Sequence, residues 1–313
     1  MVVFCAGSLM AALAPDFLVL LCGRALQALG AAAAIVTVRV ILADLFPPDQ
    51  VARAQATLMA VVLVSPTVAP VIGGQLAQWA GWRGVMGLLA AAGITGLLLA
   101  ALVLPRPASS PAPPRPRLHA AYRELLQNRR FLTGSAAMAC GSAGLYMFLG
   151  FAPFLLQHDH GLSPRDTGLA LMLVAMASIA GTRLVHVIEQ RGDALLAGAV
   201  TALAGAAFLA LFVWTGATSL AAFLGPVMLI GIAAGLTGPT GISRVLLARP
   251  GLEATATSLA GALQMATSAA ASWLLGHAGP MGLALLATGM LPVACCGLIA
   301  AVLSRPNRSP ENS

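Results

Sequence analysis

Long stretches without charged side chains alternate with short charged segments along the whole chain. A bilayer core of about 30 Å is crossed by about 20 apolar residues in a helix. Residues other than Asp, Glu, Lys and Arg fill the blocks 1–15, 54–82, 84–105, 131–158, 167–182, 194–243 and 254–304. The last two blocks are too long for one crossing, and each has a Gly-containing break near its middle, at 214–219 and 276–280. These breaks predict a helical hairpin in each block.

The pattern predicts an all-α polytopic membrane protein of about ten spans. The expected spans are 1–14, 17–39, 54–77, 84–104, 131–156, 166–186, 194–213, 219–243, 255–275 and 281–303. Composition excludes a soluble globular protein, because only 9% of the 313 residues are charged, against about 25% in soluble proteins. The apolar start could be a cleaved signal peptide, but it has no basic segment before it. We therefore interpret it as a short first span.

Arginines collect on one side of this arrangement and indicate its orientation. With both termini and the central segment in the cytoplasm, that side holds fourteen of the 17 basic residues, the opposite side holds Arg83 and Arg165, and Arg24 lies within a span. The net charge of +7 does not indicate nucleic-acid binding, because the arginines form no stripe with aromatic residues. Both termini are thus expected in the cytoplasm, with the lipid bilayer as partner.

A segment rich in proline and arginine interrupts the spans after residue 104. Proline cannot continue a helix, so this segment predicts a cytoplasmic linker that ends in a short amphipathic helix. The expected organisation is a partial N-terminal bundle of about four spans, the linker, a C-terminal six-helix bundle and a cytoplasmic tail, at 1–104, 105–130, 131–304 and 305–313.

Cysteine and histidine give no sign of a metal site, cofactor or catalytic centre. The five cysteines lie within apolar runs in no metal-binding spacing. His158 and His160 flank Asp159 in an expected outer loop, which we interpret as a polar loop tip. No carboxylate pair or Ser/His arrangement lies at depth, so we expect no enzymatic activity and no cofactor.

Arg24 is the one charged side chain expected deep in a span. It lies eight residues after Asp16, about 12 Å along a helix at 1.5 Å per residue. An ionised residue at that depth costs at least ~2.5–3.5 kcal/mol, so it should face a wet cavity or a polar partner. Gln27 lies on the same helix face at i+3. The alternative is that Arg24 reaches the lipid headgroups.

The third span carries two prolines and a glycine pair, in Ser65-Pro-Thr-Val-Ala69-Pro70-Val-Ile-Gly73-Gly74. Small residues at this spacing let two helices approach closely, and the prolines bend the helix.

These two motifs resemble the major facilitator superfamily, and most closely its drug/proton antiporter branch, the bicyclomycin-resistance (Bcr/CflA) subfamily. Arg24-x-x-Gln27-x-x-Gly30 resembles a stretch of that family's fourth helix, whose Arg is implicated in proton coupling. Ser65 to Gly74 resembles the antiporter motif of its fifth helix, with Ser65 and Ala69 in place of two glycines. Asp44, with Arg53, matches the family's loop after helix four, and Ala254 to Gly261 resembles the opening of helix eleven.

The resemblance implies a two-bundle transporter with twelve helices, whereas this chain predicts four spans before the linker and six after it. The motif expected on helix four lies on the second span, so the first hairpin and any acidic residue on it are missing. We interpret this as an N-terminally truncated gene or a start codon assigned too late.

The resemblance further implies a multi-pass protein of a bacterial inner membrane that carries out proton-driven, alternating-access efflux of drug-like amphiphiles. Its expected partners are protons and lipophilic small molecules, with no nucleic acid. In this hypothesis Arg24 and Gln27 serve coupling and the cavity, and Ser65, Ala69, Pro70, Gly73 and Gly74 bias the helices toward export. Met147, Phe148, Phe151, Gln264 and Met265 are candidates for the substrate cavity, with packing against lipid as the alternative. A metabolite exporter of the same fold and a truncated, non-functional polypeptide remain open, and a monomer is expected.

Overall fold

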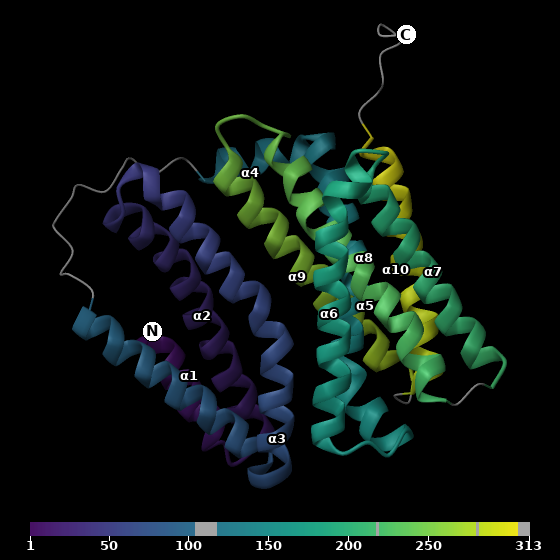
Figure 1. The fold of residues 1–313 in the computed structure, drawn as a ribbon, viewed down its shortest axis with the longest axis horizontal. Helices are drawn as coiled ribbons and strands as arrows, with labels where there is room; N and C mark the ends of the chain where they lie inside the picture. The colour runs from purple at the N-terminus through teal and green to yellow at the C-terminus, as the bar shows by residue number, and fades with distance from the viewer. Residues whose placement is uncertain (104–117, 217–218, 280–281, 306–313) are drawn as a thin grey trace, which may run out of the picture. The chain divides into compact units, whose positions relative to one another are not determined.

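The computed structural model describes residues 1–103, 118–216, 219–279 and 282–305, except for the side chain of Leu118 and some side chains between residues 39 and 63. The described residues form ten α-helices and one π-helical turn, with no strand among them, which confirms the predicted all-α fold (Figure 1). The elements are α1 (Val2–Ala12), α2 (Phe17–Leu45), α3 (Pro48–Val103), α4 (Leu118–Gln127), α5 (Arg129–Phe154), η1 (Leu155–Asp159), α6 (Pro164–Glu189), α7 (Ala194–Trp214), α8 (Leu220–Leu246), α9 (Glu253–Ala278) and α10 (Leu283–Leu303).

Seven of the described helices are long and apolar enough to cross a membrane. The count is lower than the ten predicted spans for three reasons. The α1 helix has only 11 residues, and α9, which is rich in Ser and Thr, is not among the seven. The predicted third and fourth spans form the single element α3, whose apolar part Val64–Val103 counts once. Within α3 the helix breaks at Gly81, which has φ +65° and ψ −173°, a conformation that residues other than glycine rarely adopt.

The connection between α2 and α3 is shorter than predicted. The second span was expected to end near residue 39 and the third to begin near 54, but α2 continues to Leu45 and α3 begins at Pro48. Asp44 and Arg53, which the family resemblance places in a loop, therefore lie on the two helices. The side chain of Asp44 is outside the described residues.

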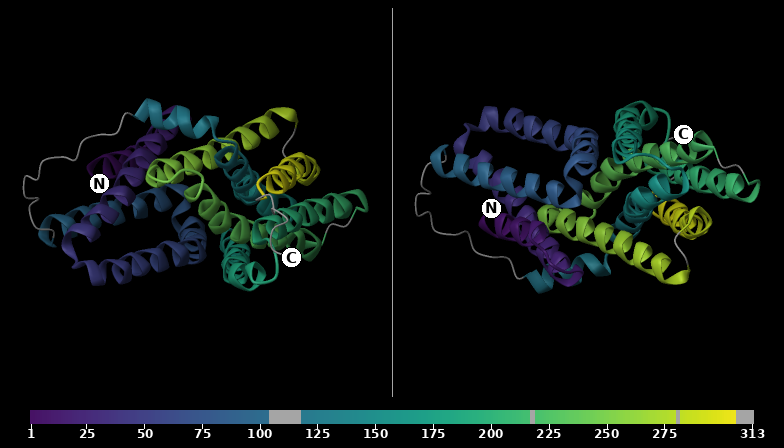
Figure 2. Two further views of the ribbon diagram at one scale, coloured as in Figure 1. Left: turned by 90° about the horizontal axis from the view of Figure 1, so that it is seen from above. Right: turned by 90° about the horizontal axis from the view of Figure 1, so that it is seen from below.

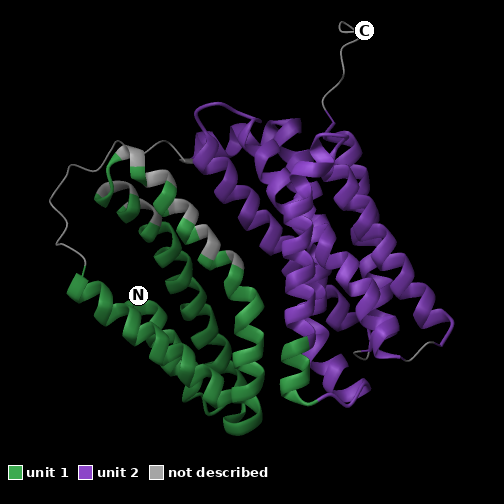
Figure 3. Ribbon diagram, in the orientation of Figure 1, with its two compact units in different colours: residues 1–112, 163–169 green, residues 113–162, 170–313 purple. Residues whose placement is uncertain are grey.

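The chain divides into two compact units, coloured separately in Figure 3. The first comprises 1–112 with 163–169, and the second comprises 113–162 with 170–313.

Glycine permits close backbone packing in the first unit, where α1 contacts both α2 and α3. A Cβ placed on Gly7 would lie 2.4 Å from the backbone N of Gln27, and one on Gly30 would lie 2.3 Å from the backbone N of Phe4. On α3, a Cβ on Gly93 would lie 2.6 Å from the ring of Phe4. Lipid is as apolar as the side chains, so this close approach supplies the van der Waals contact that holds the three helices together.

The α5 helix is the centre of the second unit and contacts α8, α9 and α10. The views from above and below show α10, in yellow, beside α5, in teal (Figure 2). A core of large buried side chains, with Phe148 and Phe223 at 5.8 Å between ring centroids, joins these helices.

The α6 and α8 helices of this unit also meet at glycine. A Cβ on Gly235 of α8 would lie 2.0 Å from the carbonyl O of Ser178. Pro239 has no N–H to donate to the carbonyl of Gly235 four residues earlier. The hydroxyl of Thr182 donates to that carbonyl at 3.2 Å, so a side chain of a neighbouring helix occupies the acceptor that proline leaves open.

The amphipathic helix predicted at the end of the linker is α4. Its Leu125 is fully buried in a small core with Phe131, Val245, Ala256 and Ala260. Glu124 forms an ion pair with Arg249. Asn128, the N-cap of α5, donates to the carbonyl O of Ala248 at 2.9 Å. The end of the linker is thus part of the second unit.

The glycine contact between α6 and α8 gives a direct test with a control on the same helix. We expect Gly235→Ala to destabilise the protein by about 1–3 kcal/mol, because the added methyl group overpacks the interface. A Cβ on Gly238 meets no atom within 4 Å, so Gly238→Ala should leave stability unchanged or raise it slightly. Thermal unfolding of both variants in detergent, followed by size exclusion, measures the difference. Equal unfolding midpoints in the two variants would contradict close packing of α6 against α8 at Gly235.

Candidate functional site

The predicted polar pair on the second span forms part of a hydrogen-bond chain in the first unit. Arg24 of α2 donates through Nη1 to Oε1 of Gln27. Gln27 donates through Nε2 to Oγ of Ser8 on α1 at 2.7 Å, and Ser8 donates to the carbonyl O of Phe4 at 2.7 Å. These hydrogen bonds link a guanidinium, an amide, a hydroxyl and a backbone carbonyl in that order. In each bond the donor is the group nearer to Arg24.

The two ends of this chain differ in exposure. Ser8 is fully buried and Gln27 is 4% exposed, whereas Arg24 lies on the surface of the first unit. A guanidinium has five N–H donors, and only one hydrogen bond of Arg24 occurs among the described residues. No carboxylate of the described residues lies within ion-pair distance of it. The buried amide of Gln27 therefore holds the guanidinium of Arg24 in one orientation. The remaining N–H donors of this guanidinium are available to a further partner.

Ser8 is the part of this site that the sequence did not reveal. A serine within an apolar run usually bonds its own helix, and Ser8 does so. Its second role, as acceptor for Gln27, depends on Gly7 and Gly23, which let α1 and α2 approach until a Cβ on either would lie within 2.4–2.7 Å of the opposite backbone.

A second polar contact fastens one end of the first unit. Arg83, which follows the break at Gly81, donates through Nη2 to the carbonyl O of Ala14 at 3.1 Å and lies 4.2 Å from the ring centroid of Trp82. Ala14 belongs to the turn between α1 and α2, so this contact joins that turn to α3.

The residues of the antiporter-like motif lie on α3. Ser65 and Ala69 are exposed, and Pro70, Gly73 and Gly74 are half-buried. Within the first unit, a Cβ on Gly74 would lie 2.4 Å from the carbonyl O of Pro164, and one on Gly168 would lie 2.4 Å from that of Pro70. A Cβ on Gly73 would meet nothing within 4 Å. The role of this motif in export stays a prediction. Arg53 is exposed on the first turns of α3.

The candidates for a substrate cavity on α5 lie inside the second unit. Met147, Phe148 and Phe151 are buried in the core that joins α5 to α8 and α10. Their role in substrate binding stays a prediction, and the packing of these side chains explains their positions within the unit.

Gln264 and Met265 are neighbours on α9 with different surroundings. Gln264 donates through Nε2 to Oγ of Ser142 on α5 at 2.6 Å, and Ser142 donates to the carbonyl O of Met138 at 2.8 Å. Met265 is 48% exposed. The side chain of Gln264 thus repeats the arrangement of Gln27, an amide that donates to a serine already bonded to its own helix. Substrate contact by either residue stays a prediction.

The sequence did not predict the ion-pair network that lies at one end of the second unit. Asp193 caps α7 by accepting from the backbone N–H groups of Leu195 and Leu196. It pairs with Nη2 of Arg244 at 2.7 Å and with Nε of Arg305 at 3.6 Å. Asp before a helix is an N-cap signal, so the cap could have been predicted, but the two arginines come from distant turns.

This network changes the acidity of Asp193. Burial alone would raise its pKa, but hydrogen bonds from Arg244 and from the α7 backbone outweigh burial and lower the pKa below the ordinary value of 3.8. The folded protein therefore favours the ionised carboxylate.

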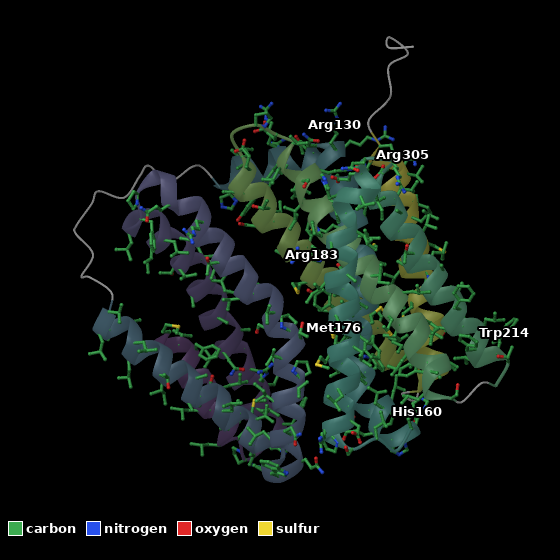
Figure 4. All side chains as sticks on the ribbon, in the orientation of Figure 1. Arg130, His160, Met176, Arg183, Trp214 and Arg305 are labelled. Carbon is green, nitrogen blue, oxygen red and sulfur yellow. The ribbon has the colours of Figure 1, made fainter. Side chains whose placement is uncertain are left out.

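His160 lies at the opposite end of this unit from the ion-pair network (Figure 4). Figure 4 shows His160 and Trp214 far from Arg130 and Arg305. His158 is in the π-helical turn and not in the loop that the sequence predicted, and its ring stacks on Phe154 with 5.0 Å between centroids. Among the described residues, no three His, Cys, Asp or Glu side chains form a metal-binding group.

Comparison with known proteins gives a consistent family. The sequence profile of the Major Facilitator Superfamily matches residues 1–272. Multidrug resistance protein D of Escherichia coli (strain K12) is 28% identical over 303 residues, which cover 94% of this chain and 76% of that protein. The bicyclomycin resistance protein homolog of Haemophilus influenzae is 25% identical over 82% of this chain and 67% of that protein.

Other relatives and solved structures extend the comparison. The chain spans 46% of the uncharacterized transporter YdgK of Bacillus subtilis, with 27% identity. A bacterial homolog of the human lysosomal transporter Spinster, solved in an inward-facing conformation, has a TM-score of 0.72 at 20% identity over 97% of this chain and 81% of that structure. A D-xylose–proton symporter gives 0.66 at 16% identity, with 97% and 78% covered. At these identities the structures show a shared fold.

The lowered pKa of Asp193 predicts a pH dependence of stability. Its folded pKa lies below the ordinary value of 3.8, so its contribution to stability is complete above that pH and is lost as the pH falls through the folded value. We expect Asp193→Asn to lower stability by about 1–2 kcal/mol near neutral pH and to flatten the acid limb of the unfolding midpoint against pH. Asp159→Asn, which affects an exposed pair with His158 alone, is the control. A similar loss of stability in both variants would contradict the stabilising role of the Asp193 ion pairs.

Proposed function

Because the chain belongs to the major facilitator superfamily, a family of membrane transporters, we propose that it is a proton-coupled exporter of lipophilic small molecules. The names of its relatives, multidrug resistance protein D and the bicyclomycin resistance protein homolog, support drug-like substrates. The proposed location is the bacterial inner membrane, and the proposed mechanism is alternating access, in which two helical bundles move about a site near the membrane midplane.

The observation that carries this proposal is the chain from Arg24 through Gln27 to Ser8. An ionised group within an apolar helix is costly and is retained where it has a partner or a function. The buried amide of Gln27 holds the guanidinium at one position, and its remaining donors are open to a substrate or to a titratable group. A small polar site on an apolar wall suits binding of amphiphiles.

The chemistry of arginine limits how Arg24 acts. Arginine stays protonated at all physiological pH values, so in this proposal Arg24 does not carry the transported proton. Its fixed charge favours the ionised form of any acid that shares the site and disfavours a second cation there.

Replacing Arg24 tests the mechanism. In an efflux-deficient bacterial strain that expresses this chain, we expect Arg24→Ala to abolish uncoupler-sensitive efflux of an uncharged lipophilic dye such as Nile red. Arg24→Lys keeps the charge and should retain part of the activity. Arg123→Ala removes an equal charge from the exposed face of α4 and should leave efflux intact. Unchanged efflux in Arg24→Ala, at equal membrane expression, would remove Arg24 from the mechanism, and absence of efflux in the unaltered chain would refute the proposed function.

The proposed orientation places the arginine-rich end of each unit in the cytoplasm. Arg130 and Arg305 lie at one end of the second unit, and Trp214 lies at the other (Figure 4).

Reporter fusions test this orientation. Green fluorescent protein fused after residue 313 should fluoresce, and alkaline phosphatase inserted after Gly216, in the connection between α7 and α8, should be active. The reverse pattern would contradict the proposed orientation.

A further inference from the structure

A basic hollow lies at the end of the second unit where α5 begins and where α8 and α10 end. It has a volume of about 510 Å³. Four of the residues that line it are arginines, and the others are one threonine, one serine and two leucines: Arg129, Arg130, Thr133, Arg244, Leu247, Leu303, Ser304 and Arg305. No carboxylate is among them.

The charges around this hollow do not cancel. Asp193 pairs with Arg244 and Arg305 from one side, and Arg244 also donates through Nη1 to the carbonyl O of Ser304 at 2.9 Å and to its Oγ at 2.8 Å. For Arg129 and Arg130, no carboxylate lies within ion-pair distance in the described part of the chain. Four guanidinium groups thus face one carboxylate.

The position of Arg129 and Arg130 adds an electrostatic cost. Both occupy the first turn of α5, which has no acidic residue. The N-terminal end of a helix is the positive end of its dipole, so cations there are unfavourable and an anion is favourable. The C-terminal carbonyls of α8 and α10 also reach this region, and Arg244 already donates to one of them. A bound anion would relieve the repulsion that remains among the arginines.

The rim of the hollow is apolar. Leu247 is 79% exposed and Leu303 is 51% exposed. Leu247 directly follows the long apolar helix α8, and Leu303 is the last residue of the long apolar helix α10, at the end where the arginines lie. Guanidinium groups bind phosphate oxygens through paired N–H donors, and exposed leucines beside them suit an acyl chain better than water.

We propose that this hollow binds the phosphodiester headgroup of an anionic phospholipid of the adjacent leaflet, with Arg129, Arg130 and Arg305 on the phosphate and Leu247 and Leu303 against its acyl chains. Basic pockets between membrane helices commonly bind anionic headgroups in this way. The site lies entirely in the second unit, and it does not depend on the transport activity proposed above.

The test is lipid binding by the purified, delipidated full chain in a non-ionic detergent. Phosphatidylglycerol should raise the thermal unfolding midpoint at concentrations at which phosphatidylcholine has no effect, and native mass spectrometry should retain the anionic lipid. In Arg129→Gln/Arg130→Gln we expect the phosphatidylglycerol concentration for half-maximal effect to rise by about tenfold or more, whereas Arg129→Lys/Arg130→Lys should keep most of the binding.

The control variant, Arg123→Gln/Arg183→Gln, removes two positive charges from positions outside the hollow. Equal weakening in this variant would show diffuse attraction and would overturn the proposal. Competition by millimolar inorganic phosphate or glycerol phosphate would identify a soluble anion and would also overturn it. Leu247→Ser, an exposed position whose substitution removes little packing, should weaken phosphatidylglycerol binding in a protein whose lipid-free unfolding midpoint is unchanged. Loss of binding there supports the acyl-chain contact even if the double arginine variant is unstable.

Discussion

Close approach of helix backbones is the interaction on which both units depend. In lipid, an apolar side chain gains little by turning from acyl chains to another helix, so association rests on van der Waals contact and on a few hydrogen bonds. Gly7 and Gly30 provide that contact between α1 and α2, and Gly235 provides it between α6 and α8. The high content of glycine, 33 of 313 residues, is therefore a structural requirement at the positions where backbones meet.

The same close approach makes the polar contacts possible. Gln27 bonds Ser8 and Gln264 bonds Ser142, and in each pair the serine also donates to its own helix four residues earlier. A hydroxyl has one donor and two acceptor positions, so it satisfies its helix and still accepts from an amide on the neighbour. This arrangement ties two helices without placing an unpaired polar group in lipid, where such a group is costly.

The sequence was sufficient to predict most of the helices and the breaks between them, because the membrane constrains the length and the polarity of every span. The hairpin breaks near Trp214 and Gly279 and the amphipathic α4 lie where the pattern put them. The pattern predicted the end of α2 and the start of α3 less well. The charged residues between 39 and 53 indicated a loop, but α2 continues to Leu45 and α3 begins at Pro48.

The candidate site was only partly predictable. Arg24 and Gln27 stand out because charge and amide are rare within an apolar run, and their spacing puts them on one face. Ser8, Ser142 and the pairing of Asp193 with Arg244 did not stand out, since each depends on which distant helix lies beside it. A pairing across 51 residues, as for Asp193 and Arg244, follows from tertiary packing and leaves no local pattern.

The contact between Arg83 and the carbonyl of Ala14 has a mechanical consequence. It fastens the turn that joins α1 to α2 directly beside the sharp bend at Gly81. A tilt of the second half of α3 would stretch this contact unless α1 and α2 moved with it. The three helices should therefore move together, since this contact adds to the glycine packing that already joins them.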